Sequence, residues 1–143
     1  MDERRILARS LVEPRSGDLR RLTPAQCHEL LTTRSVGRLA YIARAGVPDI
    51  VPVNYVMDGP AVLIRSAPGP KLQAAERREV VAFEVDEIDE DSHTGWSVVV
   101  VGLARRVSHE ESERGPQPVP WADGPRRHTI RIEPRRVEGR RLG

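Results

Sequence analysis

The sequence predicts a mainly β protein, folded as a closed or partly closed antiparallel barrel of six strands with two or three short helices. Aromatic residues make up only 3% of the chain, so the core must be aliphatic, and the many Val-rich runs favour strands. Turns that contain Gly or Pro separate these runs at short intervals. The connections are too short for the crossover helices that a parallel sheet needs.

A length of 143 residues fits one domain, and we expect an N-terminal arm over residues 1–21 before a folded domain over residues 22–143. The 23 basic and 21 acidic residues leave a net charge of +2, which argues against a nucleic-acid binder. The single cysteine, Cys27, excludes an internal disulfide and fits the cytoplasm. The sequence shows no secretory signal and no apolar run long enough for a membrane span.

The first half of the domain is expected to hold one helix and a meander. A helix over residues 23–32 has Thr23 as its cap and Pro24 in its first position, and Gln26 completes a capping box. Strands are expected at residues 18–22, 36–44, 48–57 and 61–66. Tight turns join the last three, which predicts antiparallel pairing.

The second half is expected to alternate strands with longer loops. A short helix is expected at residues 71–78, strands at 80–86, 96–108 and 127–132, and a closing segment at 135–142. The run Val98–Val101 is too apolar for a half-exposed strand. An acidic loop over residues 87–95 and a Pro-rich loop over residues 110–125 are expected to connect these elements.

The segment Ile64–Lys71 is the sharpest candidate site. A strand ends there, a Pro/Gly turn follows, and a helix begins with Lys71 in its first turn, where a cation opposes the helix dipole. An anion held between Lys71, Arg65 and the helix end would resolve this conflict, and the hydroxyl of Ser66 could donate to it. An ordinary strand–turn–helix connection with solvated charges explains these residues equally well.

Two further features could lie beside a ligand ring. Pro52 indicates a sheet edge or a bulge, where free backbone groups and Asn54 could hydrogen-bond a planar heterocycle. Trp96 and Trp121 could cover a ring or a subunit interface. An irregular strand for Pro52, and packing within the chain for the tryptophans, are the competing interpretations.

Six segments, in their order and spacing, resemble the pyridoxamine 5′-phosphate oxidase-like, FMN-binding split-barrel family, and above all its small bacterial branch with the nitroimidazole-resistance reductases. They are Gly37–Ala40, Val51–Tyr55, Arg65–Leu72, Val81–Asp86, Gly95–Gly102 and Arg131–Pro134. The resemblance extends over residues 22–141. It implies a six-stranded split barrel and a homodimer with FMN in two clefts between the subunits.

The resemblance also implies roles for individual residues. Arg65, Ser66 and Lys71 would hold the phosphate, with Leu72 in the same segment. Val53, Asn54 and Tyr55 would line the isoalloxazine ring, Trp96 and Ser97 would approach from the other subunit, and Trp121 would lie at the cleft rim. Deazaflavin-using enzymes share the fold, so deazaflavin is the alternative cofactor. The basic substrate-binding C-terminus of the true pyridoxamine phosphate oxidases is not recognisable here, which argues against that substrate.

The leading hypothesis is a cytoplasmic, dimeric FMN oxidoreductase that acts on a small molecule, with no catalytic acid or base that the sequence identifies. A second hypothesis is a flavin or haem carrier or sensor without turnover. A third is a nucleic-acid binder that uses the arginines of residues 126–141. The four histidines are scattered without metal-ligand spacing, so no metal site is expected.

Overall fold

The structure is a computed structural model, which describes residues 18–122, 124, 126 and 128–143. The strands are β1 (Leu19–Arg21), β2 (Val36–Ile42), β3 (Pro48–Asp58), β4 (Ala61–Ser66), β5 (Val80–Asp89), β6 (Thr94–Val107) and β7 (His128–Leu142). The α-helices in the described part are α2 (Pro24–Leu31), α3 (Pro70–Glu76) and α4 (His109–Arg114), with a 3₁₀ turn η1 (Arg44–Gly46).

Strands β2 to β7 close into a six-stranded antiparallel barrel. The order is β7-β4-β3-β2-β5-β6, and β6 pairs back onto β7. This closure and the three short helices confirm the fold class that the sequence predicts. Strand β1 pairs with residues 140–142 of β7, so the end of the expected N-terminal arm belongs to the sheet. The rest of that arm, residues 1–17, lies outside the described part.

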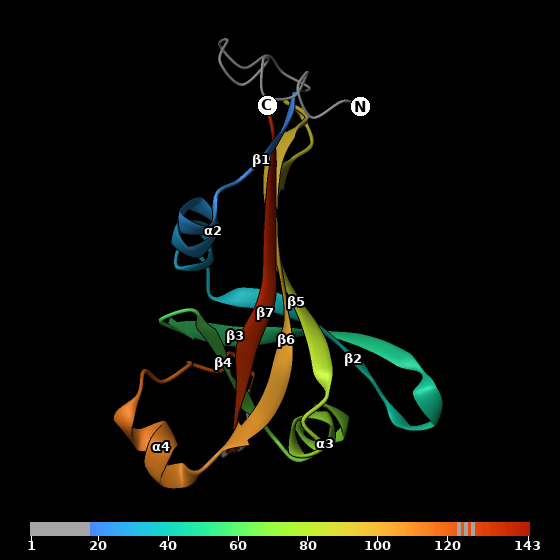
Figure 1. The fold of residues 1–143 in the computed structure, drawn as a ribbon, viewed down its shortest axis with the longest axis vertical. Helices are drawn as coiled ribbons and strands as arrows, with labels where there is room; N and C mark the ends of the chain where they lie inside the picture. Colours follow the sequence, from blue (N-terminus) through green and yellow to red (C-terminus); the bar gives the residue numbers. More distant parts are fainter. Residues whose placement is uncertain (1–17, 123, 125, 127) are drawn as a thin grey trace.

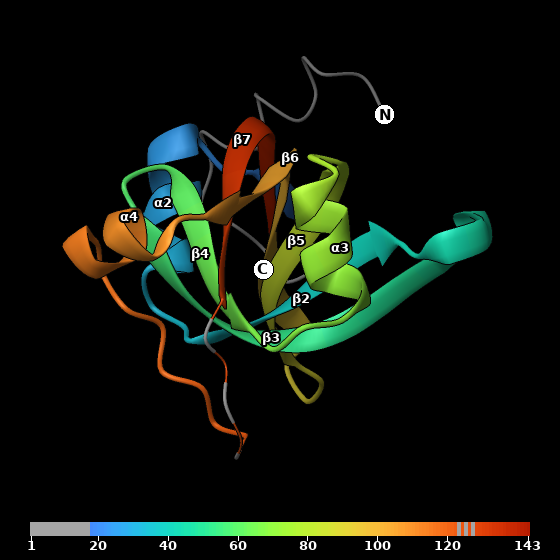
Figure 2. The same cartoon turned by 90° about the horizontal axis from the view of Figure 1, so that it is seen from below.

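The barrel carries two extensions. Strands β6 and β7 are 14 and 15 residues long and continue beyond the barrel to meet β1 (Figure 1). Helix α2 lies beside this extension, whereas α3 and α4 lie at the opposite end of the molecule. The β2–β3 hairpin projects sideways with η1 at its tip (Figure 2). Ala45 and Gly46 in this turn have φ of 64° and 73°, the left-handed backbone that the Ala-Gly pair provides.

Helix α2 begins where the sequence predicts. The backbone N–H of Gln26 donates to Oγ1 of Thr23 at 3.2 Å, and the backbone N–H of Thr23 donates to Oε1 of Gln26 at 2.9 Å. The capping box is therefore formed, with Pro24 as the first helical residue. The helix buries Cys27 and Leu31 against the barrel.

Pro52 lies at an open sheet edge, as its sequence predicts. It pairs with Arg38 of β2, but β3 pairs with β4 only from Tyr55 to Asp58. The edge of β3 at Pro52 that faces away from β2 therefore needs no N–H donor.

Three segments differ from the sequence-based expectation. Most of the expected acidic loop is a hairpin, because β5 runs to Asp89 and pairs with β6 from Thr94 onward. The carboxylate of Asp89 accepts hydrogen bonds from the backbone N–H groups of Asp91 and Ser92 at 3.0 and 3.2 Å, which closes this turn.

The expected Pro-rich loop begins with helix α4. Ser108 caps this helix, since its hydroxyl accepts a hydrogen bond from the backbone N–H of Glu111 at 3.2 Å. The third difference is that the expected last strand and the closing segment form one strand, β7. The register shifts between Val101 and Gly102 of β6, where the extra residue is Arg135 of β7, and this bulge allows β7 to continue through Pro134 without a break.

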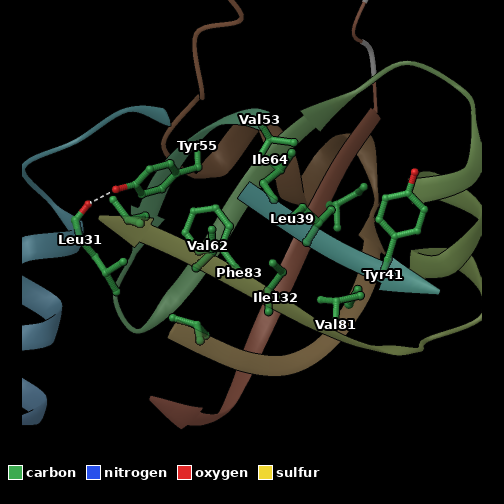
Figure 3. Packing of buried hydrophobic residues seen from close by; sticks show 14 of the residues in the cluster. Leu31, Leu39, Tyr41, Val53, Tyr55, Val62, Ile64, Val81, Phe83 and Ile132 are labelled. Atoms are coloured by element: carbon green, nitrogen blue, oxygen red, sulfur yellow. Dashed lines mark hydrogen bonds between the residues drawn. The ribbon is translucent and has the colours of Figure 1, made fainter. Parts of the chain in front are cut away.

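The core is aliphatic and centred on one phenylalanine (Figure 3). Phe83 is fully buried, and the ring of Tyr55 meets it edge-on with centroids 4.8 Å apart. In the apolar run on β6, Val98 and Val100 are fully buried, whereas Val99 and Val101 are partly exposed. The expectation that both faces of this run are buried is therefore wrong for the single chain, because β6 has the barrel on one side only.

Candidate functional site

Arg65 projects from the outer face of the barrel near the end of β4. Its neighbours Ile64 and Ser66 are fully buried, so Arg65 points the other way. Its Nη2 atom donates to Oε1 of Gln117 at 2.8 Å. In the described part of the chain no carboxylate forms an ion pair with it. Arg65 is therefore a half-buried cation whose partner is a neutral amide.

Ser66 does not face the same way as Arg65. Its side chain is fully buried, and its hydroxyl donates to the carbonyl oxygen of Ala67 at 2.6 Å. Alternation along the strand sends the two side chains to opposite faces. The structure thus separates two of the three side chains that the sequence groups around a phosphate.

Lys71 lies in the first turn of α3 and is half-buried. Burial, and next the positive charge of Arg126, lower the pKa of the Lys71 ammonium below its usual value. None of the described carboxylates pairs with Lys71. Two cations near one another, without a described counter-charge, favour an anion between them, so the residues present fit a phosphate group.

Arg126 is a residue that the sequence did not assign to this site. It is 55 positions beyond Lys71 in the chain, and no motif joins the two. Leu72, the residue after Lys71, is 4% exposed and belongs to the core. It supports α3 by packing, and its side chain does not reach the surface.

The structure brings Asn54 and Trp121 together. Asn54 faces outward from β3, and its Oδ1 accepts a hydrogen bond from the backbone N–H of Trp121 at 2.8 Å. The side chain of Trp121 is 72% exposed. The indole is thus held near Asn54 by its backbone, with its ring free to contact another molecule.

Val53 and Tyr55 point into the barrel, on the other side of the strand from Asn54 (Figure 3). The hydroxyl of Tyr55 donates to the carbonyl oxygen of Leu31 at 2.5 Å. Burial raises the pKa of Tyr55 to about 12, against the charge of Arg34, which lowers it. Both side chains are structural in this chain, so only main-chain atoms of Val53 and Tyr55 can meet a ligand on the outer face.

Trp96 and Ser97 line a cleft of about 540 Å³ at the end of the molecule that carries β1. The other lining residues include Leu19, Ile88 and Arg140. Trp96 is only 6% exposed, and the guanidinium carbon of Arg34 lies 5.8 Å from the centroid of its ring. Ser97 takes the opposite face of β6 and is half-buried.

Trp96 is far from Arg65 within one chain. Arg65 pairs with Thr129, which pairs with Val107 at the other end of β6. Trp96 and Val107 are separated along this strand by roughly 35 Å at the usual rise per residue. One ligand can meet both regions only if they belong to two different subunits.

Two of the C-terminal arginines are paired with acids. Arg131 pairs with Asp58 at 2.5 Å and with Glu133 at 2.6 Å, and Arg136 lies 3.6 Å from Glu138. These acids neutralise part of the positive charge along β7. The arrangement weakens the case for a nucleic-acid site. Across the described residues, no helix has the length and apolar character that a membrane crossing requires.

The closed antiparallel barrel defines a small split-barrel protein, and its strand–helix junction carries the cations Arg65 and Lys71. A family model described as pyridoxamine 5′-phosphate oxidase matches residues 23–141. The chain therefore belongs to the pyridoxamine 5′-phosphate oxidase-like split-barrel family, as the six sequence segments indicate.

Three known proteins are similar to this chain over most of its length. The uncharacterized protein Rv0080 of Mycobacterium tuberculosis is 37% identical over 79% of this chain and 78% of its own length. The FAD binding protein of Mycobacterium smegmatis is 30% identical, with a TM-score of 0.65 over 87% of this chain and 99% of its own. An FAD-binding protein of Mesorhizobium loti is 26% identical, with a TM-score of 0.70 over the same shares.

Proposed function

We propose that this protein binds a flavin by its phosphate and serves as an oxidoreductase for a small molecule. The observation that carries the proposal is the half-buried Lys71, which is under the positive charge of Arg126 and has no described carboxylate as a partner. Arg65, paired with an amide only, supplies a second phosphate-binding group close in sequence. The two FAD-binding proteins that share the fold support a flavin as the source of the phosphate.

The residues of this chain would bind and orient the cofactor. The planar guanidinium of Arg65 suits a phosphate with two parallel hydrogen bonds, and Lys71 adds a compact charge. Asn54 offers a donor and an acceptor to the edge of the ring. A bound flavin supplies hydride or electron transfer, and the protein places it against the substrate.

FMN is the cofactor that the resemblance implies, whereas the two structural neighbours support FAD. Both carry the phosphate that the cations fit, and a deazaflavin is the third candidate. Parallel titrations with FMN, FAD and a deazaflavin, followed by quenching of their fluorescence, would rank the three. We expect riboflavin, which lacks a phosphate, to bind more weakly than FMN.

We also propose a homodimer with the cofactor between subunits. Trp96 and Ser97 can share a ligand with Arg65 only across two chains, because the length of β6 separates the two regions of one chain by roughly 35 Å. Light scattering after gel filtration should give twice the chain mass of 16.0 kDa. A monomer that still binds flavin would remove Trp96 and Ser97 from the site.

The function is tested with purified protein in two steps. We expect it to take up a flavin, and the bound flavin to be reduced by a nicotinamide donor in the absence of air. Failure to bind FMN, FAD and a deazaflavin would overturn the whole proposal. If the flavin binds but neither a nicotinamide donor nor any of a set of small reductants reduces it, the result would favour a carrier or sensor.

A further inference from the structure

Residues 115–122, which follow α4, lie against the candidate site. We call residues 115–122 the strap. Two hydrogen bonds tie it to the barrel: Gln117 Oε1 accepts from Arg65, and the backbone N–H of Trp121 donates to Asn54. Figure 2 shows α4 beside β4, with the connection leaving from it. The strap therefore occupies polar groups on β3 and β4 that are candidates for ligand binding.

The two tied residues are neighbours on the sheet. The pairing of β3 with β4 ends at Tyr55 and Ile64. Just beyond this pair, the next residue is Asn54 on β3 and Arg65 on β4. Both side chains lie on the outer face, since their neighbours are buried. One ligand with an anionic end and a polar ring edge could reach both.

The amide of Gln117 is held in a fixed orientation. Its Nε2 atom donates to the carbonyl oxygens of Ser112 and Gly115, the latter at 3.4 Å, at the C-terminal end of α4. Its oxygen is therefore turned toward Arg65. The guanidinium of Arg65 thus donates to a neutral amide oxygen. A phosphate oxygen in the same place would accept a stronger, charge-assisted hydrogen bond.

From this geometry we propose that the strap is a ligand-displaced cover of the phosphate site. The flavin phosphate takes the place of the Gln117 amide on Arg65, and release of the strap frees the side-chain oxygen of Asn54 for the ring. Gln117 is thus a residue that competes with the cofactor. This inference rests on the proposed flavin binding and assigns its control to a particular side chain.

Gln117→Ala tests the inference by removing the competing acceptor while leaving Arg65 in place. Because one net hydrogen bond is worth about 1 kcal/mol, we expect FMN to bind about fivefold more tightly, with a faster association in stopped-flow quenching. Riboflavin affinity should rise less than FMN affinity, because riboflavin has no phosphate to replace Gln117 on Arg65 and displaces the strap only at Asn54. Gln26→Ala, in the capping box of α2, is the control for loss of a glutamine elsewhere.

FMN affinity that falls in Gln117→Ala would make Gln117 a ligand of the phosphate, and unchanged affinity would make the contact irrelevant; either result overturns the inference. If wild-type protein binds no flavin, the proposed function fails. Inorganic pyrophosphate then tests separately whether an anion displaces the strap from Arg65. Pyrophosphate should shift the backbone amide signal of Trp121 in wild-type protein and not in Arg65→Ala. An unmoved signal would overturn the inference.

Discussion

The hydroxyl of Tyr55 donates a 2.5 Å hydrogen bond to the main-chain carbonyl of Leu31, the last residue of α2. The last carbonyls of a helix have no partner inside it, so this bond satisfies one of them in a buried place. It also joins α2 to the barrel at the point where the ring of Tyr55 meets Phe83.

Tyr55→Phe should therefore lower the free energy of unfolding by about 1 kcal/mol or more, because a buried carbonyl loses its donor. Urea unfolding followed by circular dichroism measures this. Tyr41→Phe is the matched control, since its hydroxyl bonds Asp49 at 3.0 Å in the partly exposed β2–β3 hairpin. An equal loss of unfolding free energy in the two variants would show that the hydrogen bond from Tyr55 to α2 contributes no more than the partly exposed one of Tyr41.

Gly102 allows β6 and β7 to approach closely at the bulge. A Cβ at this position would lie 2.1 Å from the carbonyl oxygen of Glu133, a backbone atom that cannot turn away. Gly102→Ala should lower the free energy of unfolding by about 2 kcal/mol or more, measured by thermal or urea unfolding. Gly115→Ala meets no atom within 4 Å and should be close to neutral. A neutral Gly102→Ala would contradict the register at the bulge.

Glu84 makes stability depend on pH. Burial, and then the hydrogen bond and charge of Asp86, raise its pKa from 4.5 to about 7, although Arg38 opposes this. The folded state holds this proton more tightly than the unfolded state does. The stabilisation is therefore complete below pH 4.5 and is lost as the pH rises to about 7.

Glu84→Gln should remove this loss. The free energy of unfolding of the variant minus that of wild type should be larger at pH 8 than at pH 5. The difference should be on the order of 1 kcal/mol, because water partly screens the Glu84–Asp86 pair. Urea unfolding at both values measures the difference. Glu29→Gln, at an exposed position of α2 without a described ion pair, is the control and should show no such trend. A wild-type stability that rises from pH 5 to pH 8 relative to Glu84→Gln would reverse the sign and refute the prediction.

Lys71→Ala and Arg126→Ala should each weaken flavin binding by about tenfold or more, because a charge-assisted bond is worth about 1.5–3 kcal/mol. Arg114→Ala removes an arginine that is not in this pair, so its effect should be small. Isothermal titration with FMN measures all three. Loss of affinity in Lys71→Ala alone would leave Arg126 outside the site, and equal affinities for Lys71→Ala and Arg114→Ala would remove Lys71 from it.

The sequence by itself determined the features that depend on near neighbours in the chain. The capping box of Thr23 and Gln26 is formed, and the three-stranded meander from residue 36 to residue 66 has the predicted order. Both rest on hydrogen bonds and turns between residues a few positions apart. The Ser108 cap of α4 was also readable in principle, from a serine followed by Glu111 three residues later.

Only the tertiary structure decided how distant segments meet. The resemblance implied that Asn54 and Tyr55 both line the ring, but the closed barrel turns the side chain of Tyr55 inward and leaves that of Asn54 outside. In the same way, the positions of Arg126 near Lys71 and of Gln117 on Arg65 depend on the path of the chain after α4. The physical reason is that these contacts join residues about fifty positions apart, which local propensities and spacing do not specify.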